Sequence, residues 1–272
     1  MGYKIRTLSL LPRYLQKRIL FSRYNQEISA SGEYELRLLS KLLKPDDVAL
    51  DVGANLGVYS YLLSTICART IGFEPNATLA KILERLRLPR LEIVNAAVSS
   101  SVGVAELVVP KSRSGHVLAS LHPRLRRENG DQVDVFNVKT VTIDSLQLSK
   151  VDFIKIDVEG FEDDVIKGAE LVLDTHKPII LCEIEERHNP GGLDRINKYL
   201  SEKGYEGYFF KSNQMHDIQD FCIDKYQNYA ESHTKTEQNR SNIDYINNFM
   251  FIHRERDLLE IKRDLGLVMT AA

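Results

Sequence analysis

The stretch VALDVGANLGVYSYLL, residues Val48 to Leu63, determines how this chain folds. An apolar run from Val48 to Val52 precedes a glycine-containing turn, and apolar residues then recur at helical spacing. This order predicts a strand, a tight turn and a helix, which together form half of a βαβ unit. Gly53 and Gly57 allow the backbone of the turn to approach a ligand closely. We therefore expect a ligand-binding site at the end of the first strand.

Several side chains of this stretch are candidate ligand contacts. Asp51, near the end of the strand, can accept hydrogen bonds from a donor-rich ligand. Asn55 adopts left-handed backbone angles more readily than most residues. The following helix, which contains Tyr59, presents free N–H groups to the same space. The predicted binding residues are Asp51, Gly53, Asn55, Gly57 and Tyr59; the alternative is a turn whose glycines serve packing only.

The next predicted strand ends in an acid that narrows the class of ligand. Thr70 to Glu74 reads as this strand, and an acid at this position binds the ribose diol in dinucleotide folds. The dinucleotide fingerprint is absent, because Asn55 and Val58 occupy positions where it requires small residues. The pattern D-x-G-x-x-x-G followed by an acid suits a nucleoside without a pyrophosphate, such as S-adenosylmethionine.

Three further residues complete the predicted cofactor site. Pro75 follows Glu74 directly, and Asn95 and Ala96 stand at the end of a third predicted strand, Leu91 to Ala97. Asn95 is suited to hydrogen-bond an adenine edge, and it is equally suited to be a turn residue. We expect Glu74, Pro75, Asn95 and Ala96 to contact the nucleoside.

A second stretch, VDFIKIDVEGFEDDVIKG from Val151 to Gly168, places charges on a predicted strand. Side chains alternate along a strand, so Lys155, Asp157 and Glu159 share one face. Buried charges are costly unless paired, and Lys155 lies close enough to Asp157 for an ion pair. Ligands of open α/β sheets bind outside the carboxyl ends of the strands. The three residues are therefore candidate catalytic groups, with Asp157 also a cofactor contact; the alternative is an ion pair and a helix cap without chemistry.

Composition excludes several classes of protein. A net charge of −2 argues against a dedicated nucleic-acid binder. The cysteines are three and widely spaced, and Cys67 and Cys182 lie in apolar elements, which favours buried thiols of a cytoplasmic protein over a disulfide framework. No apolar run reaches the roughly 18 residues of a membrane span. The apolar run near the N-terminus ends at Pro12, unlike a signal peptide.

The N-terminal segment, residues 1–26, carries six basic residues and no acid. A helix is predicted from about Pro12, with Leu11, Leu15 and Ile19 on one face. A basic amphipathic helix of this kind can make peripheral contact with an anionic membrane. The alternative is a helix whose apolar face covers the main domain.

An ordered set of motifs resembles the FkbM-type S-adenosylmethionine-dependent methyltransferases. The motifs are LDVGANLGVYS, GFEPN, NAAVSS, TIDSL, VDFIKIDVEGFE and PIILCEIE. The resemblance implies the Rossmann-like class I methyltransferase fold: an α/β structure with a mostly parallel seven-stranded sheet, helices on both faces and an antiparallel last strand. We expect residues 1–44 to form a helical extension and residues 45–272 the methyltransferase domain. The loop 111–131 and the insertion 211–247 are the expected acceptor-site elements.

The resemblance also implies an activity. It implies O-methylation of a hydroxyl of a sugar, glycan or natural product, with S-adenosylhomocysteine as the cofactor product. Two alternatives remain open: a nicotinamide-dependent sugar oxidoreductase and a non-catalytic, partner-binding relic of the fold. The oxidoreductase would need a Tyr-x-x-x-Lys pair. Tyr14 and Lys17 are one residue too close together for this pair, and they precede the first strand. The expected partner is a small-molecule or glycan acceptor, and the sequence predicts no oligomeric state.

Methylation of a hydroxyl requires that its proton be removed, because a hydroxyl is a poor nucleophile. The candidate bases are Asp157, Glu159, His116 and His188. A metal is the other solution, and Asp157, Glu159 and Glu183 would then form an oxygen-only site suited to Mg²⁺. Of the two alternatives we expect the base, without a bound metal ion; Mg²⁺ remains possible.

Overall fold

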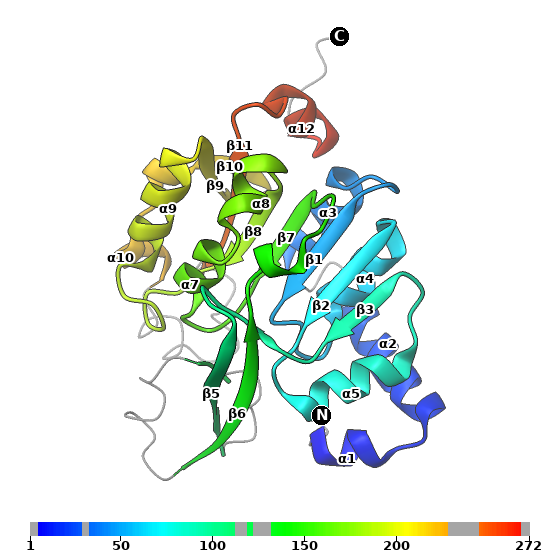
Figure 1. Ribbon diagram of the computed structural model, residues 1–272. Coiled ribbons are helices and arrows are strands. Elements are labelled where there is room, and N and C mark those ends of the chain that lie inside the picture. The colour runs from blue at the N-terminus through cyan, green and yellow to red at the C-terminus, as the bar shows by residue number, and fades with distance from the viewer. Residues whose placement is uncertain (1–4, 29–32, 112–118, 122–131, 228–244, 268–272) are drawn as a thin grey trace.

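The computed structural model describes residues 5–28, 33–111, 119–121, 132–227 and 245–267. Its centre is an eight-stranded sheet (Figure 1). The strands lie in the order β10 (Gln214–Asp217), β9 (Tyr205–Lys211), β11 (Asn248–His253), β8 (Ile179–Glu183), β7 (Phe153–Ile156), β1 (Val48–Val52), β2 (Arg69–Phe73) and β3 (Leu91–Val94). β1, β2, β3, β7 and β8 pair in parallel, and β11 is antiparallel to both its neighbours. The predicted mostly parallel sheet with an antiparallel last strand is confirmed.

β10 adds an eighth strand that the sequence did not predict. It pairs antiparallel with β9 through a two-residue connection, Ser212 and Asn213. Both residues have positive φ, 50° and 62°, which is the backbone conformation of a tight hairpin turn. The polar composition of this segment hid the hairpin. It is followed by a 3₁₀ turn, η2 (Ile218–Asp220), and the short helix α10 (Ile223–Tyr226).

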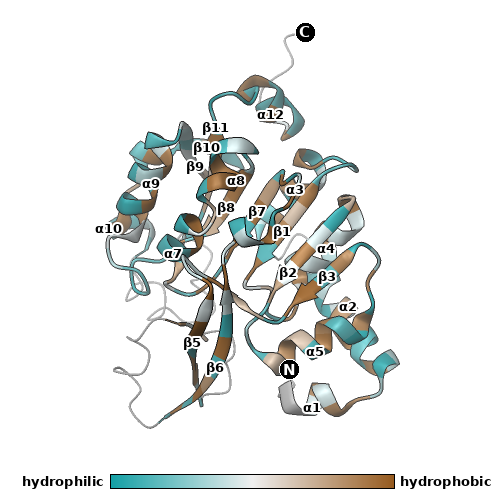
Figure 2. Cartoon of the chain, in the orientation of Figure 1, coloured by the Kyte–Doolittle hydropathy of each residue, from teal (hydrophilic) through white to brown (hydrophobic). Residues whose placement is uncertain are grey.

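Helices cover both faces of the sheet. Along β1, Leu50 and Val52 pack on one side and Ala49 on the other, as strand alternation requires. The first side is covered by α7 (Glu162–Lys167), α8 (Glu170–Thr175) and α9 (Gly192–Glu202). The second is covered by α3 (Tyr34–Leu42), α4 (Val58–Ile66) and α12 (Leu258–Asp264). Apolar residues are concentrated in the strands and on the sheet-facing sides of helices (Figure 2).

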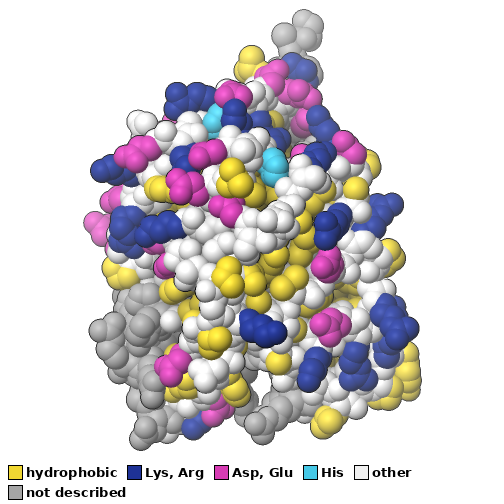
Figure 3. Space-filling view, viewed as in Figure 1, with side chains coloured by type: hydrophobic (Ala, Val, Ile, Leu, Met, Phe, Trp, Pro, Cys, Tyr) yellow, Lys and Arg dark blue, Asp and Glu magenta, His cyan; other side chains and the backbone are white. Residues whose placement is uncertain are grey.

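A separate three-stranded sheet extends below the main one in Figure 1. It consists of β4 (Ala97–Val98), β6 (Val133–Val141) and β5 (Gly103–Pro110), and β5 pairs antiparallel with β6. The third strand was predicted to run to Ala97, but it leaves the main sheet after Val94, and Ala97 belongs to the second sheet. Hydrophobic side chains gather near the middle of the face shown in Figure 3. A 3₁₀ turn, η1 (Asp144–Leu146), leads from β6 towards β7.

The N-terminal helices, α1 (Ile5–Leu10) and α2 (Arg13–Ile28), pack beside α5 (Ala77–Leu86). The fully buried side chains of α2 are Gln16, Leu20 and Tyr24, and Leu11 and Ile19 of the predicted face are partly buried against the same cluster. Tyr24 reaches the glycine turn, where its hydroxyl donates a hydrogen bond to the carbonyl of Leu56. Contact of the exposed side with a membrane stays a prediction.

The first part of the 211–247 insertion belongs to the folded core. Phe221 and Tyr226 pack against Phe209 of β9, with ring centroids 5.2 and 5.9 Å away. Residues 228–244 lie outside the described part.

The prediction of buried thiols is confirmed for Cys67 and Cys182. Within the described residues, no helix has the length and apolarity needed to cross a bilayer.

Candidate active site

A cavity lies where the chain leaves β1, β2, β3 and β7, at the carboxyl edge of the main sheet. Its empty space, open mouth included, is about 550 Å³. Six of the predicted cofactor contacts line it: Gly53, Asn55, Glu74, Pro75, Ala96 and Asp157. Further lining comes from Val52, Phe73, Ala97, Val98, Leu107, Leu121, Val158, Glu159 and Phe161. One wall of the cavity is therefore apolar, and carboxyl groups line the remainder.

Gly53 is required because two loops touch at this point. A Cβ atom on Gly53 would lie 1.8 Å from the carbonyl oxygen of Asp157, and the φ of Gly53 is +89°. The amide of Asp157 donates to the carbonyl of Val52, which joins the same two loops. Only glycine permits this approach. The turn after β1 and the carboxylate after β7 consequently form one continuous wall.

The carboxyl group of Glu74 joins the turn after β1 to the turn after β2 by hydrogen bonds. One oxygen accepts a hydrogen bond from the amide of Asn55 and the other from the amide of Asn76, both at 2.7 Å. Burial raises the pKa of Glu74 to about 7, although the two amide hydrogen bonds oppose this. The side chain of Asn95 donates to the carbonyls of Glu74 and Pro75 and does not line the cavity. Asn95 thus holds this segment in place.

Asn55 presents an unused acceptor to the site. Its φ is +49°, the left-handed conformation that was predicted for this position. Its Oδ1 atom is buried and has no hydrogen-bond partner among the described residues. A buried polar atom without a partner is costly. Such an atom in a cavity wall is suited to a ligand that brings a donor.

Besides Asn95, three predicted cofactor contacts do not line the cavity. Asp51 is buried and accepts a hydrogen bond from Ser60 Oγ at 2.5 Å, and burial raises its pKa to about 6. Gly57 packs against Leu83. The hydroxyl of Tyr59 donates to Glu33 at 2.6 Å. These residues support the turn from behind and do not line the cavity.

Lys155 is completely buried and pairs with a different acid than predicted. Its Nζ lies 3.8 Å from Glu183 Oε2, 3.0 Å from Asn248 Oδ1 and 4.9 Å from the centre of the Tyr59 ring. The predicted Lys155–Asp157 ion pair does not form. Glu183 ends β8, which is the neighbour of β7, so it reaches the ammonium across the sheet. Burial lowers the pKa of Lys155, but Asp157 and Glu183 raise it above its ordinary value overall.

Asp157 and Glu159 line the cavity, and both have raised pKa values. Burial raises the pKa of Asp157, and the charge of Lys155 only partly offsets this. Among the described residues, no hydrogen bond or ion pair to the Asp157 carboxylate is found. Burial, and then the negative charges of Asp157 and Glu185, raise the pKa of Glu159 to about 9. Glu159 is therefore protonated at neutral pH.

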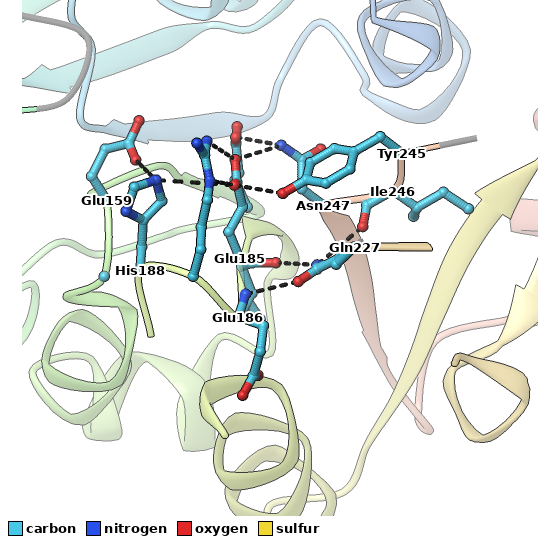
Figure 4. Close-up of polar contacts among 12 residues, drawn as sticks. Glu159, Glu185, Glu186, His188, Gln227, Tyr245, Ile246 and Asn247 are labelled. Carbon is cyan, nitrogen blue, oxygen red and sulfur yellow. Dashed lines mark hydrogen bonds and ion pairs between the residues drawn. The ribbon is translucent and has the colours of Figure 1, made fainter. Parts of the chain in front are cut away.

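A network of polar side chains borders these acids (Figure 4). His188 Nε2 lies 3.2 Å from Glu159 Oε2 and 4.0 Å from Glu185 Oε2. The hydroxyl of Tyr245 donates to Glu185 at 2.7 Å, and Arg187 also pairs with this acid. Burial raises the pKa of Glu185, but the hydrogen bonds from Arg187 and Tyr245 make the net shift downward. The network fixes His188 beside the cavity.

The remaining predictions concern His116 and a metal site. His116 lies outside the described residues. Within the described part of the chain, no three His, Cys, Asp or Glu side chains are arranged to hold a metal ion. Glu183 pairs with Lys155 and Glu159 with His188, and neither forms a common coordination site with Asp157. The sequence analysis missed Leu107, Leu121 and Phe161 in the cavity wall. No spacing rule links Leu107 in β5 of the second sheet to the first sheet, and Phe161, which directly precedes α7, carries no charge or motif that marks it as a ligand contact.

The sheet order β3-β2-β1-β7-β8-β11-β9, with the antiparallel strand inserted next to last and a cavity at the glycine turn, defines a class I methyltransferase. The sequence model of the FkbM methyltransferase domain matches residues 51–206. The chain belongs to this family.

Several known proteins are similar to the chain. The hexuronic acid methyltransferase AglP of Haloferax volcanii is 30% identical over 206 residues, which cover 72% of this chain and 78% of AglP. The AMB antimetabolite synthetase AmbE of Pseudomonas aeruginosa is 24% identical, and the match covers 61% of this chain but 10% of that protein. A crystal structure of methyltransferase FkbM from Methylobacillus flagellatus KT has a TM-score of 0.48 and 13% identity, covering 88% of this chain and 60% of that one.

Proposed function

We propose that this protein is an S-adenosylmethionine-dependent O-methyltransferase that acts on a hydroxyl group of a sugar. The family assignment and the similarity to a hexuronic acid methyltransferase support this proposal. The observation that carries it is the cavity, in which the Gly53 backbone, the Asn55 side chain and the Glu74 carboxyl meet. The family assignment also favours a methyltransferase over the nicotinamide-dependent alternative.

The residues of the cavity fit the parts of this cofactor. Glu74 has a carboxyl group at the end of β2, where it can accept hydrogen bonds from ribose hydroxyls. The unpartnered Oδ1 of Asn55 suits the ammonium group of a methionine moiety. Pro75, Ala96 and Phe161 offer an apolar wall to a planar base. The bound cofactor supplies an electrophilic methyl group.

We assign the removal of the acceptor proton to Asp157. Its carboxylate lines the cavity, and its raised pKa makes it a stronger base than an exposed aspartate. Glu159, with a pKa of about 9, is the weaker candidate because it already holds a proton at neutral pH. His188 lies beside Glu159 and can receive a proton from it. The chain thus offers a base in the cavity and, in Glu159 and His188, a second pair of groups that can exchange a proton.

The test of this function is titration calorimetry with S-adenosylmethionine and S-adenosylhomocysteine. We expect both to bind, and Glu74→Ala to weaken both by roughly 1.5–3 kcal/mol, the range for hydrogen bonds to a charged group. Glu84→Ala, which removes an exposed carboxylate of α5, is the matched control and should bind like the wild type.

A folded wild-type protein that binds neither compound would refute the proposed function. The same titration with a nicotinamide dinucleotide tests the oxidoreductase alternative. Binding of the dinucleotide in place of S-adenosylmethionine would support that alternative.

A further inference from the structure

A second pocket opens at the carboxyl edge of the main sheet, on the side covered by α3. It has an empty volume of about 710 Å³, open mouth included. Three segments far apart in the sequence enclose it: the start of α3, the β9–β10 connection and the start of β11. The lining residues are Glu33, Tyr34, Glu35, Phe210, Lys211, Ser212, Asn213, Tyr245, Ile246, Asn247 and Asn248. None of these residues lines the cavity of the glycine turn.

The lining combines aromatic rings with amide and carboxyl groups. The rings of Tyr34 and Phe210 lie 5.7 Å apart, and the hydroxyl of Tyr34 reaches the carbonyl of Asn213 at 3.5 Å. Apolar walls with a few polar groups are typical of small-molecule sites. A sugar ring has apolar C–H faces and a rim of hydroxyl groups, so aromatic walls and an amide-rich rim match both parts.

One acidic side chain of this pocket is largely buried. Glu35 is 8% exposed, and it lines the pocket. Burial raises the pKa of Glu35 above its ordinary value, although a hydrogen bond from its own backbone opposes this. A largely buried carboxyl group is unfavourable, and a hydrogen bond to a ligand hydroxyl would reduce this cost. The position of Glu35 in the pocket wall is therefore suited to a ligand with hydroxyl groups.

The second pocket adjoins the acids of the candidate active site. Asn248 accepts a hydrogen bond from Lys155 Nζ at 3.0 Å, and Asn247 donates to Glu183 Oε1 at 2.5 Å. Lys155 lies in β7, and Asp157 follows the last residue of that strand directly. The second pocket thus adjoins Lys155 and Glu183, and Lys155 stands two positions before Asp157, which lines the cavity of the glycine turn.

We propose that the second pocket binds an uncharged sugar ring of the acceptor and directs one of its hydroxyl groups towards Asp157. This inference rests on the proposed function and specifies its substrate class. The ring is uncharged because Glu33 and Glu35 line the pocket. Among the described lining residues the one cation is Lys211, which lies 3.3 Å from the Tyr226 hydroxyl and 5.2 Å from the centre of that ring. A carboxylate-bearing ring would meet two acids and a cation that already has a partner.

Saturation-transfer NMR on the full chain loaded with S-adenosylhomocysteine tests this proposal. The probes are the methyl glycosides of glucose, galactose and mannose, with methyl glucuronide as the charged comparison. We expect saturation transfer to at least one neutral glycoside and at least fivefold less to the glucuronide. Asn213→Gly, which keeps the positive φ, and Tyr34→Ala should each weaken binding at least tenfold. The matched controls are Gln214→Ala and Tyr14→Ala, which alter exposed residues outside the pocket.

The outcomes separate this proposal from the proposed function. Absence of binding by every neutral glycoside would overturn the sugar pocket, and preferential binding of the glucuronide would overturn its uncharged specificity. Binding that persists in both pocket variants would place the sugar elsewhere. Calorimetry of the same variants with S-adenosylmethionine tests the proposed function separately, since neither substitution touches the cofactor cavity.

Discussion

Lys155 is the single buried cation among the acids described around the candidate site. Its ammonium interacts with Glu183, and Asp51 is its register partner on β1. Removal of one partner from a buried ion pair leaves an uncompensated charge. We expect Lys155→Met to lower the free energy of unfolding by about 3–5 kcal/mol, measured by urea denaturation.

Lys150→Met is the matched control for this substitution. Lys150 makes ion pairs with Asp46, Asp47 and Asp152, but its side chain is 44% exposed. Exposed ion pairs contribute about 0–1 kcal/mol, so this variant should remain close to the wild type. Equal losses in both variants would mean that burial of Lys155 has no special role.

Asp157→Asn tests the assignment of the base. The amide keeps the size of the side chain and cannot accept the proton, so turnover should fall a hundredfold or more. Affinity for S-adenosylmethionine should stay near the wild-type value in calorimetry. A variant with ordinary turnover on the acceptor would transfer the role of base to His188 or His116. Asp157 would then be only a wall of the cavity.

Alternation along one strand predicts which residues share a face, and this is why Lys155, Asp157 and Glu159 could be grouped from the sequence. It does not predict which side chain of the next strand lies opposite. The actual partner of Lys155, Glu183, depends on the neighbouring position of β7 and β8 and on their register. The positions of Leu107 and Leu121 depend likewise on how the second sheet packs, which no local pattern encodes.

At the scale of the elements, α2 supports the glycine turn. The hydroxyl of Tyr24 donates to Leu56, and its ring stacks on Tyr61 with centroids 4.9 Å apart. Tyr24→Phe removes only the hydroxyl and leaves a buried carbonyl without its donor. We expect a loss of about 1–2 kcal/mol in the free energy of unfolding and weaker binding of S-adenosylmethionine by calorimetry. Tyr61→Phe keeps the ring stack and should change neither quantity.

If Tyr24→Phe lost stability but bound the cofactor as tightly as the wild type, α2 would be a packing element alone. The sequence predicted a helix here, and its most deeply buried residues stand one position later than Leu15 and Ile19 of the predicted face. One of them is Gln16, whose side chain donates to the carbonyl of Leu8 in the preceding helix. A polar residue in a buried position breaks the apolar periodicity on which the prediction relied.

At the scale of the whole molecule, several buried carboxyl groups bind protons more tightly than in an unfolded chain. Burial raises the pKa of Asp51 to about 6, of Glu74 and Glu162 to about 7, and of Glu159 to about 9. Each raised pKa means that the folded protein keeps a proton that the unfolded chain has released. Their contribution to stability is present at low pH and is lost as pH rises through these pKa values.

We therefore expect the free energy of unfolding of the ligand-free protein to fall between about pH 5 and pH 9, measured by urea denaturation at each pH. Glu159→Gln removes the carboxyl group with the highest of these pKa values. It should reduce the fall of the unfolding free energy between pH 7 and 9 by up to about 1.4 kcal/mol per pH unit. A flat profile in the wild type would show that these groups titrate alike in the folded and unfolded chain.

The overall architecture could largely be predicted from the sequence, because the βα repeats carry strong local signals. The central strands are buried on both faces and read as apolar runs, and the helices between them show clear periodicity. The second sheet was only partly predictable, since most residues of β6 are exposed and form no continuous apolar run. β10 was missed because Gln214 to Asp217 has no apolar pattern.

Both outer strands of the main sheet, β10 and β3, are four residues long. An unpaired strand edge is a template for a strand of another molecule, and a short edge offers few backbone groups to such a partner. β9, seven residues long and rich in aromatic side chains, would be the edge if β10 were detached. We therefore expect the small hairpin at Ser212 and Asn213 to protect the molecule against aggregation. Disruption of that turn should lower the solubility of the protein while the rest of the sheet stays folded.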